Sequence, residues 1–126
     1  MSSGVRSYIC LNPYQRVPDQ LTTRKVRNRL RSMNNPMNKE EICERLEAMS
    51  GWAWEADRLS KTYEFKNFRE AMSFLLRLSY EAEEQNHHPE IFNCYKQVKL
   101  SLNTHDAGGK VTEKDFRLAR AIDSIA

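Results

Sequence analysis

The chain has 126 residues, of which 40% are hydrophobic and 29% charged, with four glycines and four prolines. This length suits one globular domain and excludes a barrel of eight βα units or a two-domain nucleotide enzyme. No stretch approaches the roughly 18 apolar residues of a transmembrane helix, so we expect no membrane partner. Three widely spaced cysteines, Cys10, Cys43 and Cys94, predict free thiols in a reducing compartment rather than a disulfide framework.

Charge divides the chain into two unlike parts. Residues 1–38 contain seven arginines and lysines against one acid, Asp19, whereas residues 39–126 contain thirteen basic side chains against sixteen acids. We therefore expect a basic N-terminal extension, 1–38, followed by one mildly acidic domain, 39–126. Within the extension, residues 21–33 are compatible with a short basic helix.

Three interpretations of the basic extension stay open. It is a solvated tail, as runs of like charge commonly are, or a nucleic-acid contact, or a mitochondrial targeting or partner-docking arm, which the scarcity of acids favours. Five basic residues between Arg24 and Arg31 would suit phosphates, but no aromatic residue lies among them and the domain is net negative. Both features argue against a nucleic-acid partner. We expect a mitochondrial location, with the cytoplasm or the nucleus as alternatives.

The first elements of the domain are a helix and two strands. Asn38 is predicted to cap the helix and Gly51 to end it. One strand is expected around residues 52–55 and a second near 59–65, with a turn at residues 56–57 between them.

A second helix, two more strands and a third helix follow. Asn67 is predicted to cap the second helix, whose inward stripe we expect to be Phe68, Ala71, Met72, Leu75, Leu78, Ser79 and Ala82. Strands are predicted near 91–95 and over 97–103, the latter from strict alternation of apolar and polar residues. Thr112 is predicted to cap the last helix, with its buried face at Phe116, Ala119, Ile122 and Ile125.

The order of these elements is α-β-β-α-β-β-α. Short links between neighbouring strands favour antiparallel pairing, and a sheet with one apolar face needs helices to cover it. We therefore predict an α+β fold, a four-stranded antiparallel sheet with three helices on one face. Its open face and its edge strands favour oligomerisation.

All three histidines of the chain, His87, His88 and His105, border the third and fourth strands. Histidine titrates near neutrality, so such a cluster suits proton transfer in both directions. Two alternatives remain: solvated residues at element ends, and a three-histidine metal site. Adjacent histidines on extended chain aim poorly at one ion, so we expect no metal.

The spacing around these histidines carries a resemblance. Glu83-x-x-x-His87-His88-Pro89, followed by Tyr95, Thr104-His105 and Asp115, resembles the signature of the pterin-4a-carbinolamine dehydratases. The similarity extends from Gly51-Trp52 through residues 65–68 and covers about residues 39–125. The basic extension lies outside it.

The resemblance implies an activity and a fold. Members of this family are lyases that dehydrate 4a-hydroxytetrahydrobiopterin to quinonoid dihydropterin in tetrahydrobiopterin recycling, and they need no metal or organic cofactor. Their fold agrees with the element order above, and they assemble as homodimers and homotetramers. Relatives also act as coactivators and assembly factors, so a non-catalytic binding module, served by residues 1–38, is the alternative function.

The resemblance also implies roles for individual residues. His87 and His105 would be the acid/base pair, and His88 would orient the pterin. Glu83 would be a carboxylate partner either to a histidine or to the amino-pyrimidine edge of the pterin. Substrate contacts would come from His87, His88, Pro89, Thr104, His105 and Asp106. Trp52 is either an aromatic wall of the site or plain core. Two departures stand out: Asn86 replaces a common aspartate, and the loop after His105 is one residue longer than is common.

Overall fold

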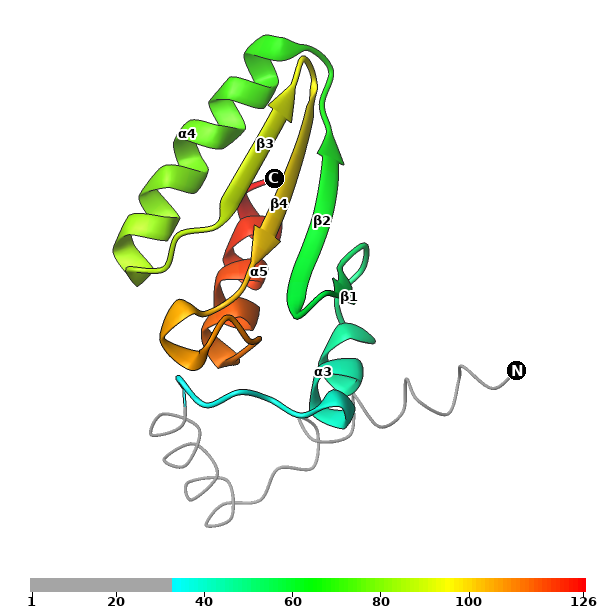
Figure 1. Cartoon of the computed structure of the whole chain (residues 1–126). Helices are drawn as coiled ribbons and strands as arrows, with labels where there is room; N and C mark the ends of the chain where they lie inside the picture. The colour runs from blue at the N-terminus through cyan, green and yellow to red at the C-terminus, as the bar shows by residue number, and fades with distance from the viewer. Residues whose placement is uncertain (1–32) are drawn as a thin grey trace, which may run out of the picture.

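The computed structural model describes residues 33–126, and Figure 1 shows how their helices and strands are arranged. The basic segment up to residue 32, nearly all of the helix expected over 21–33, and Cys10 lie outside the described residues. At the start of the described part, the backbone N–H of Met37 donates to the carbonyl of Val111 at 2.9 Å. Met37 also packs against the core, so residues just before the helix that starts at Lys39 already contribute to the fold.

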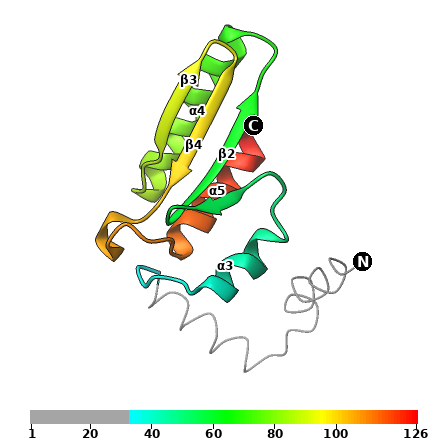
Figure 2. The same ribbon diagram turned by 45° about the vertical axis from the view of Figure 1, so that its right-hand side comes forward.

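The sheet has four strands in the order β1-β2-β4-β3, and every neighbouring pair is antiparallel. This confirms the predicted α+β class. Figure 2 shows β4 between β2 and β3, which leaves β1 and β3 as the two edges. The strands are β1 (Ala53–Glu55), β2 (Arg58–Glu64), β3 (Glu90–Cys94) and β4 (Gln97–Leu102).

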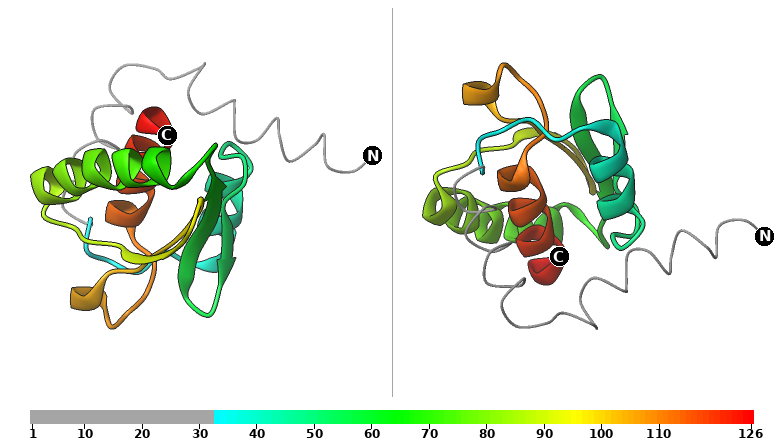
Figure 3. Two further views of the ribbon diagram at one scale, coloured as in Figure 1. Left: turned by 90° about the horizontal axis from the view of Figure 1, so that it is seen from above. Right: turned by 90° about the horizontal axis from the view of Figure 1, so that it is seen from below.

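Three α-helices are present among the described residues. They are α3 (Lys39–Leu46), α4 (Phe68–Gln85) and α5 (Glu113–Ile125), and a short 3-10 helix, η1 (His105–Ala107), follows β4. Figure 3 shows α4 and α5 together on one side of the sheet, with α3 beside β1 and β2. No helix formed by residues 33–126 lies on the other face of the sheet (Figures 2 and 3).

The predicted caps begin all three helices. The side chain of Asn38 accepts the N–H of Glu41 at 2.8 Å, and that of Asn67 accepts the N–H of Glu70 at 2.9 Å. Thr112 forms a capping box with Asp115. A side-chain oxygen placed here satisfies N–H groups that have no partner inside the helix.

A tight turn joins β1 to β2, as predicted. Ala56 and Asp57 have φ values of 53° and 60°, so both lie in the left-handed region. Two successive residues in this region make the turn whose twist matches that of an antiparallel hairpin. Leu59 thereby enters β2 pointing into the core, where it is fully buried.

One core lies between the sheet and its helices. It contains the inward residues of β2 and β4, the inner faces of α4 and α5, and the buried Ile42 of α3. Tyr63 and Phe65 pack on the ring of Phe74, with centroids 5.1 and 4.9 Å away. The largest buried side chains are Phe74, Phe116, Ile42, Leu59, Leu78, Leu100, Leu102, Leu118 and Ile122.

The first helix ends earlier than predicted. We expected Gly51 to follow its last turn, but α3 ends at Leu46. The next N–H groups bond three residues back rather than four, Ala48 to Arg45 and Met49 to Leu46, which tightens the chain into turns. The helical path is lost, and Met49 still reaches the core.

The inner face of α4 is also rotated relative to the prediction. Ala71, Phe74, Leu78 and Ala82 are buried, whereas Phe68 and Met72 are 48% and 36% exposed and Ser79 is exposed. The predicted stripe is therefore wrong at these three exposed positions and misses Phe74. Apolar residues occur around much of this helix, so periodicity alone did not identify which face meets the sheet.

We predict that Phe74→Ala lowers the free energy of unfolding by about 3–5 kcal/mol, because it removes a fully buried ring and leaves a cavity. Urea denaturation followed by circular dichroism measures this change. Ser79→Ala on the exposed side of the same helix is the control, expected within about 0.5 kcal/mol of wild type. Equal stability of Phe74→Ala and wild type would contradict this packing.

Candidate functional site

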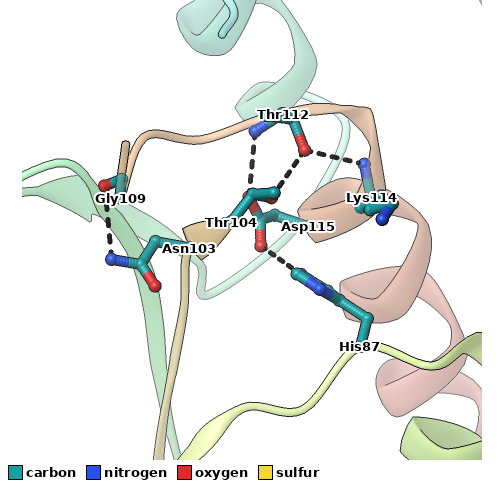
Figure 4. A network of polar contacts seen from close by, with 7 residues as sticks. All are labelled: His87, Asn103, Thr104, Gly109, Thr112, Lys114 and Asp115. Atoms are coloured by element: carbon teal, nitrogen blue, oxygen red, sulfur yellow. Dashed lines mark hydrogen bonds and ion pairs between the residues drawn. The ribbon is translucent and has the colours of Figure 1, made fainter. Parts of the chain in front are cut away.

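The predicted site residues gather at one end of the β3–β4 hairpin. Glu90, the first residue of β3, pairs with Ser101 near the end of β4. His87 and His88 lie just before β3, and η1 begins three residues after the end of β4, so antiparallel pairing brings both segments to the same end of the sheet. The N-terminus of α5 reaches the same region, as Figure 4 shows.

The reversal of the chain at the end of α4 gives the two adjacent histidines different exposures. Asn86 caps the helix in the left-handed conformation, with φ of 50°, and the N–H of His87 donates to the carbonyl of Ala82 at 3.0 Å. Asparagine tolerates this backbone region better than most residues. After this reversal, His87 is only 8% exposed. The side chain of its neighbour His88 is 59% exposed.

His87 meets a buried carboxylate. Its Nε2 lies 2.6 Å from Oδ1 of Asp115, which has no exposed surface. Figure 4 shows the imidazole pointing from the end of α4 toward the first turn of α5. A charged group without exposure needs partners within hydrogen-bond distance, and His87 supplies one of them.

Two threonines complete the surroundings of Asp115. Its Oδ2 accepts from the hydroxyl of Thr104 and from the backbone N–H of Thr112, both at 2.9 Å. The hydroxyls of Thr104 and Thr112 lie 2.7 Å apart, and both residues are buried. Thr104 is a predicted substrate contact, and that role stays a prediction. In this structure its hydroxyl bonds within the network (Figure 4).

Glu83 and His88 form a second, exposed pair. Oε1 of Glu83 lies 3.0 Å from Nε2 of His88, with the carboxylate side chain 80% exposed. The two side chains come from the last turn of α4 and from the chain just after it. The structure therefore places Glu83 beside a histidine, as one of the two predicted roles requires.

The remaining predicted site residues lie on exposed chain. His105 and Asp106 begin η1, and both are exposed. Among the residues that the structure describes, neither side chain has a hydrogen bond or an ion pair. Pro89 joins the two histidines to β3 and is partly exposed. The side chains of His105 and Asp106 are therefore available to an incoming ligand.

Trp52 belongs to the core rather than to this group. It is 6% exposed, and its Nε1 donates to Asp123 at 3.0 Å. Asp123 lies two turns along α5 from Asp115, toward the C-terminal end of that helix. Of the two interpretations of Trp52, the structure supports plain core.

Three further features of the described residues concern metal ions, membranes and a hollow in the surface. Within residues 33–126, no group of three or more His, Cys, Asp or Glu side chains could hold a metal ion. No helix in that same part of the chain is long and apolar enough to cross a membrane. A hollow of about 460 Å³ lies over β3 and β4, lined by Glu90, Ile91, Phe92, Lys99 and Ser101, none of which is a predicted site residue.

The reasoning from sequence did not identify what Asp115 does in the site. Its signal was present, because Thr112-x-x-Asp115 has capping-box spacing and Asp115 is part of the family signature. The capping box accounts for the bond between Asp115 and the backbone N–H of Thr112 without any other element of the fold. Only the fold shows that its second oxygen faces His87, 28 residues away.

Comparisons with known proteins identify the family of the chain. Residues 35–125 match the family described as "Pterin 4 alpha carbinolamine dehydratase". Proteins named "Putative pterin-4-alpha-carbinolamine dehydratase" from Opitutus terrae and Sulfolobus acidocaldarius are 53% and 44% identical to the chain. The matches cover 71% of this chain in both cases, and 93% and 97% of the relatives.

A solved structure shares the fold. The crystal structure of a "transcriptional coactivator/pterin dehydratase" from Brucella melitensis superposes with a TM-score of 0.70 at 35% identity. The superposition covers 73% of this chain and 99% of that one. The matched region includes every histidine of the chain and the whole network around Asp115. The chain therefore belongs to the pterin-4a-carbinolamine dehydratase family.

Proposed function

We propose that this protein is a 4a-hydroxytetrahydrobiopterin dehydratase that acts by histidine acid/base catalysis in tetrahydrobiopterin recycling. The observation that carries the proposal is the placement of two kinds of histidine at one end of the hairpin. His87 is buried against a carboxylate, and His105 is exposed on η1. One proton donor and one acceptor are what this dehydration needs.

The reaction removes water across a carbon–nitrogen bond. The hydroxyl on C4a leaves as water after it takes a proton from an acid. The lone pair on N5 forms the C=N bond, and a base removes the N5 proton. The ring nitrogen supplies the electron pair, so positioned imidazoles suffice and no metal or organic cofactor is required. In this scheme His87 and His105 exchange the protons, while His88 and Glu83 orient the pterin with Pro89, Thr104 and Asp106.

A second candidate function is a non-catalytic binding module. The similar Brucella melitensis protein is named a transcriptional coactivator as well as a pterin dehydratase. This chain also exposes large apolar side chains that could hold a partner. Retention of all three histidines favours catalysis, and the two functions can coexist on one fold.

The exposed apolar side chains support assembly into a homodimer or homotetramer. Phe68, Met72, Leu76 and Tyr80 recur every four residues on α4, so they form one stripe, separate from the stripe that meets the sheet. β3 is an edge strand and exposes Ile91 and Phe92, and α4 lies over the β3–β4 side of the sheet (Figures 1 and 2). A two-fold axis at this place would cover both features at once.

Residues 1–38 suit a targeting or docking arm. Their basic composition and near absence of acids are the only support, and they fit a mitochondrial location with the cytoplasm or nucleus as alternatives. We propose no membrane or nucleic-acid partner, since the domain that follows is net negative.

We predict that the protein accelerates dehydration of freshly generated 4a-hydroxytetrahydropterin, and that His105→Ala lowers kcat by about 100-fold or more. His105 is exposed and its side chain makes no hydrogen bond or ion pair within residues 33–126, so we expect this variant to keep its fold and the loss to be chemical. Stopped-flow absorbance measures the rate. Lys96→Ala, in the turn at the far end of the hairpin, is the control. A folded wild type without acceleration would overturn the catalytic proposal.

We predict that a double variant, Leu76→Glu with Tyr80→Glu, reduces the assembly to smaller species. Two charges on the outer stripe of α4 cannot be buried unpaired at an interface. Light scattering after size exclusion gives the mass, and Thr62→Glu on the open face of the sheet is the matched control. A monomeric wild type, or an unchanged mass in the double variant, would contradict self-assembly through this stripe.

We predict that residues 1–38 fused to a fluorescent protein carry it to mitochondria in cultured eukaryotic cells. Replacing the five basic residues between 24 and 31 with glutamine is expected to abolish the transfer, since targeting depends on positive charge. Diffuse fluorescence from the unmodified fusion would favour the cytoplasmic or nuclear alternative.

A further inference from the structure

Each donor in the hydrogen-bond network around Oδ2 of Asp115 can be assigned, and the donated protons point toward that oxygen. The N–H of Lys114 donates to Oγ1 of Thr112 at 3.2 Å. Thr104 donates its hydroxyl proton to Oδ2 of Asp115, so the bond between the two threonine hydroxyls must be donated by Thr112. The backbone N–H of Thr112 donates to the same Oδ2. Each threonine hydroxyl has only one proton, and each proton is used.

This direction fixes what the other carboxylate oxygen does. Two donors already point at Oδ2, and a carboxylate oxygen only accepts, so Oδ1 is left as an acceptor for His87. The only group of His87 that faces Oδ1 is Nε2, at 2.6 Å. A neutral imidazole has one ring proton, so a proton held at Nε2 leaves a lone pair on Nδ1.

We propose that Asp115 is a positioning residue that holds His87 in its Nε2–H form, so that Nδ1 is the base that takes the N5 proton of the pterin. This rests on the proposed function. Once Nδ1 is protonated, the buried carboxylate stabilises the imidazolium. His105, on the other segment of the site, is then the acid that protonates the departing hydroxyl. Asp115 itself does not touch the substrate.

The geometry also explains why the network includes Thr104. Oδ1 faces His87 only if Oδ2 is held on the far side, and the Thr104 hydroxyl and the Thr112 N–H do this from two different segments (Figure 4). Thr104 directly precedes His105, so the chain that carries the proposed acid is tied to the carboxylate that orients the base.

Asp115→Asn makes a sharp test because it preserves shape and reverses one bond. The asparagine oxygen stays with the two donors, Thr104 and the Thr112 N–H. Its NH₂ group then faces Nε2 of His87, which must become an acceptor, so the ring proton moves to Nδ1. A carboxylate-to-amide change that selects the wrong tautomer removes the base without removing the ring.

The experiment reads the tautomer and the rate separately. The full chain is labelled with ¹⁵N-histidine, and long-range ¹H–¹⁵N spectra are recorded at a pH where the imidazoles are neutral. With only three histidines present, His88→Gln and His105→Gln variants assign the signals of His87. We expect Nε2–H in the wild type and Nδ1–H in Asp115→Asn. We also expect kcat for 4a-hydroxytetrahydropterin to fall by about 100-fold or more with little change in KM.

A matched control variant and three contrary outcomes test the role of Asp115. Glu64→Gln makes the same chemical change at an exposed ion pair with Lys96 and is expected to alter neither readout. An Nδ1–H tautomer in the wild type would overturn the proposal, even if Asp115→Asn failed to fold. An unchanged kcat in a folded Asp115→Asn would also overturn it. A wild type with Nε2–H but no dehydration would instead overturn the proposed function.

Discussion

A carboxylate without any exposed surface dictates the arrangement of the site. Asp115 must find hydrogen-bond partners for both oxygens inside the protein, and it draws them from the end of α4, the chain after β4 and its own helix cap. A buried polar group left without its hydrogen-bond partner typically costs about 1–3 kcal/mol, and a charged group costs more. The hydrogen bonds of this one carboxylate therefore hold three segments at the same end of the sheet. The chain after α4 carries His87 and His88, and Thr104 after β4 directly precedes His105.

A second carboxylate on α5 secures the other end of that helix. Asp123 accepts from Trp52, from Lys61 at 2.8 Å and from the hydroxyl of Tyr63. Burial, followed by the bond to Asp123 and its charge, raises the pKa of the Tyr63 phenol, which keeps it a donor. Because both ends of α5 are tied to different elements, Asp115 has little freedom to move relative to His87.

The parts of the fold with local signals were predictable. Asn38, Asn67 and Thr112 cap helices because each offers an oxygen to nearby N–H groups, and alternation identified β4. The inner face of α4 was not predictable, since its exposed stripe is also apolar and periodicity weighs both alike. The site was predictable only in its residue types. The partner of each Asp115 oxygen is set by tertiary contacts, such as the contact between Oδ1 and His87.

The contact between His87 and Asp115 joins residues 28 positions apart and requires α5 to be docked. Neither the helix that precedes His87 nor the helix that contains Asp115 can form this contact alone. Closing such a long loop costs entropy, so the contact depends on the tertiary packing that holds α4 and α5 together. A partly folded chain thus holds all its histidines and yet lacks the contact between His87 and Asp115, which is a property of the complete tertiary structure.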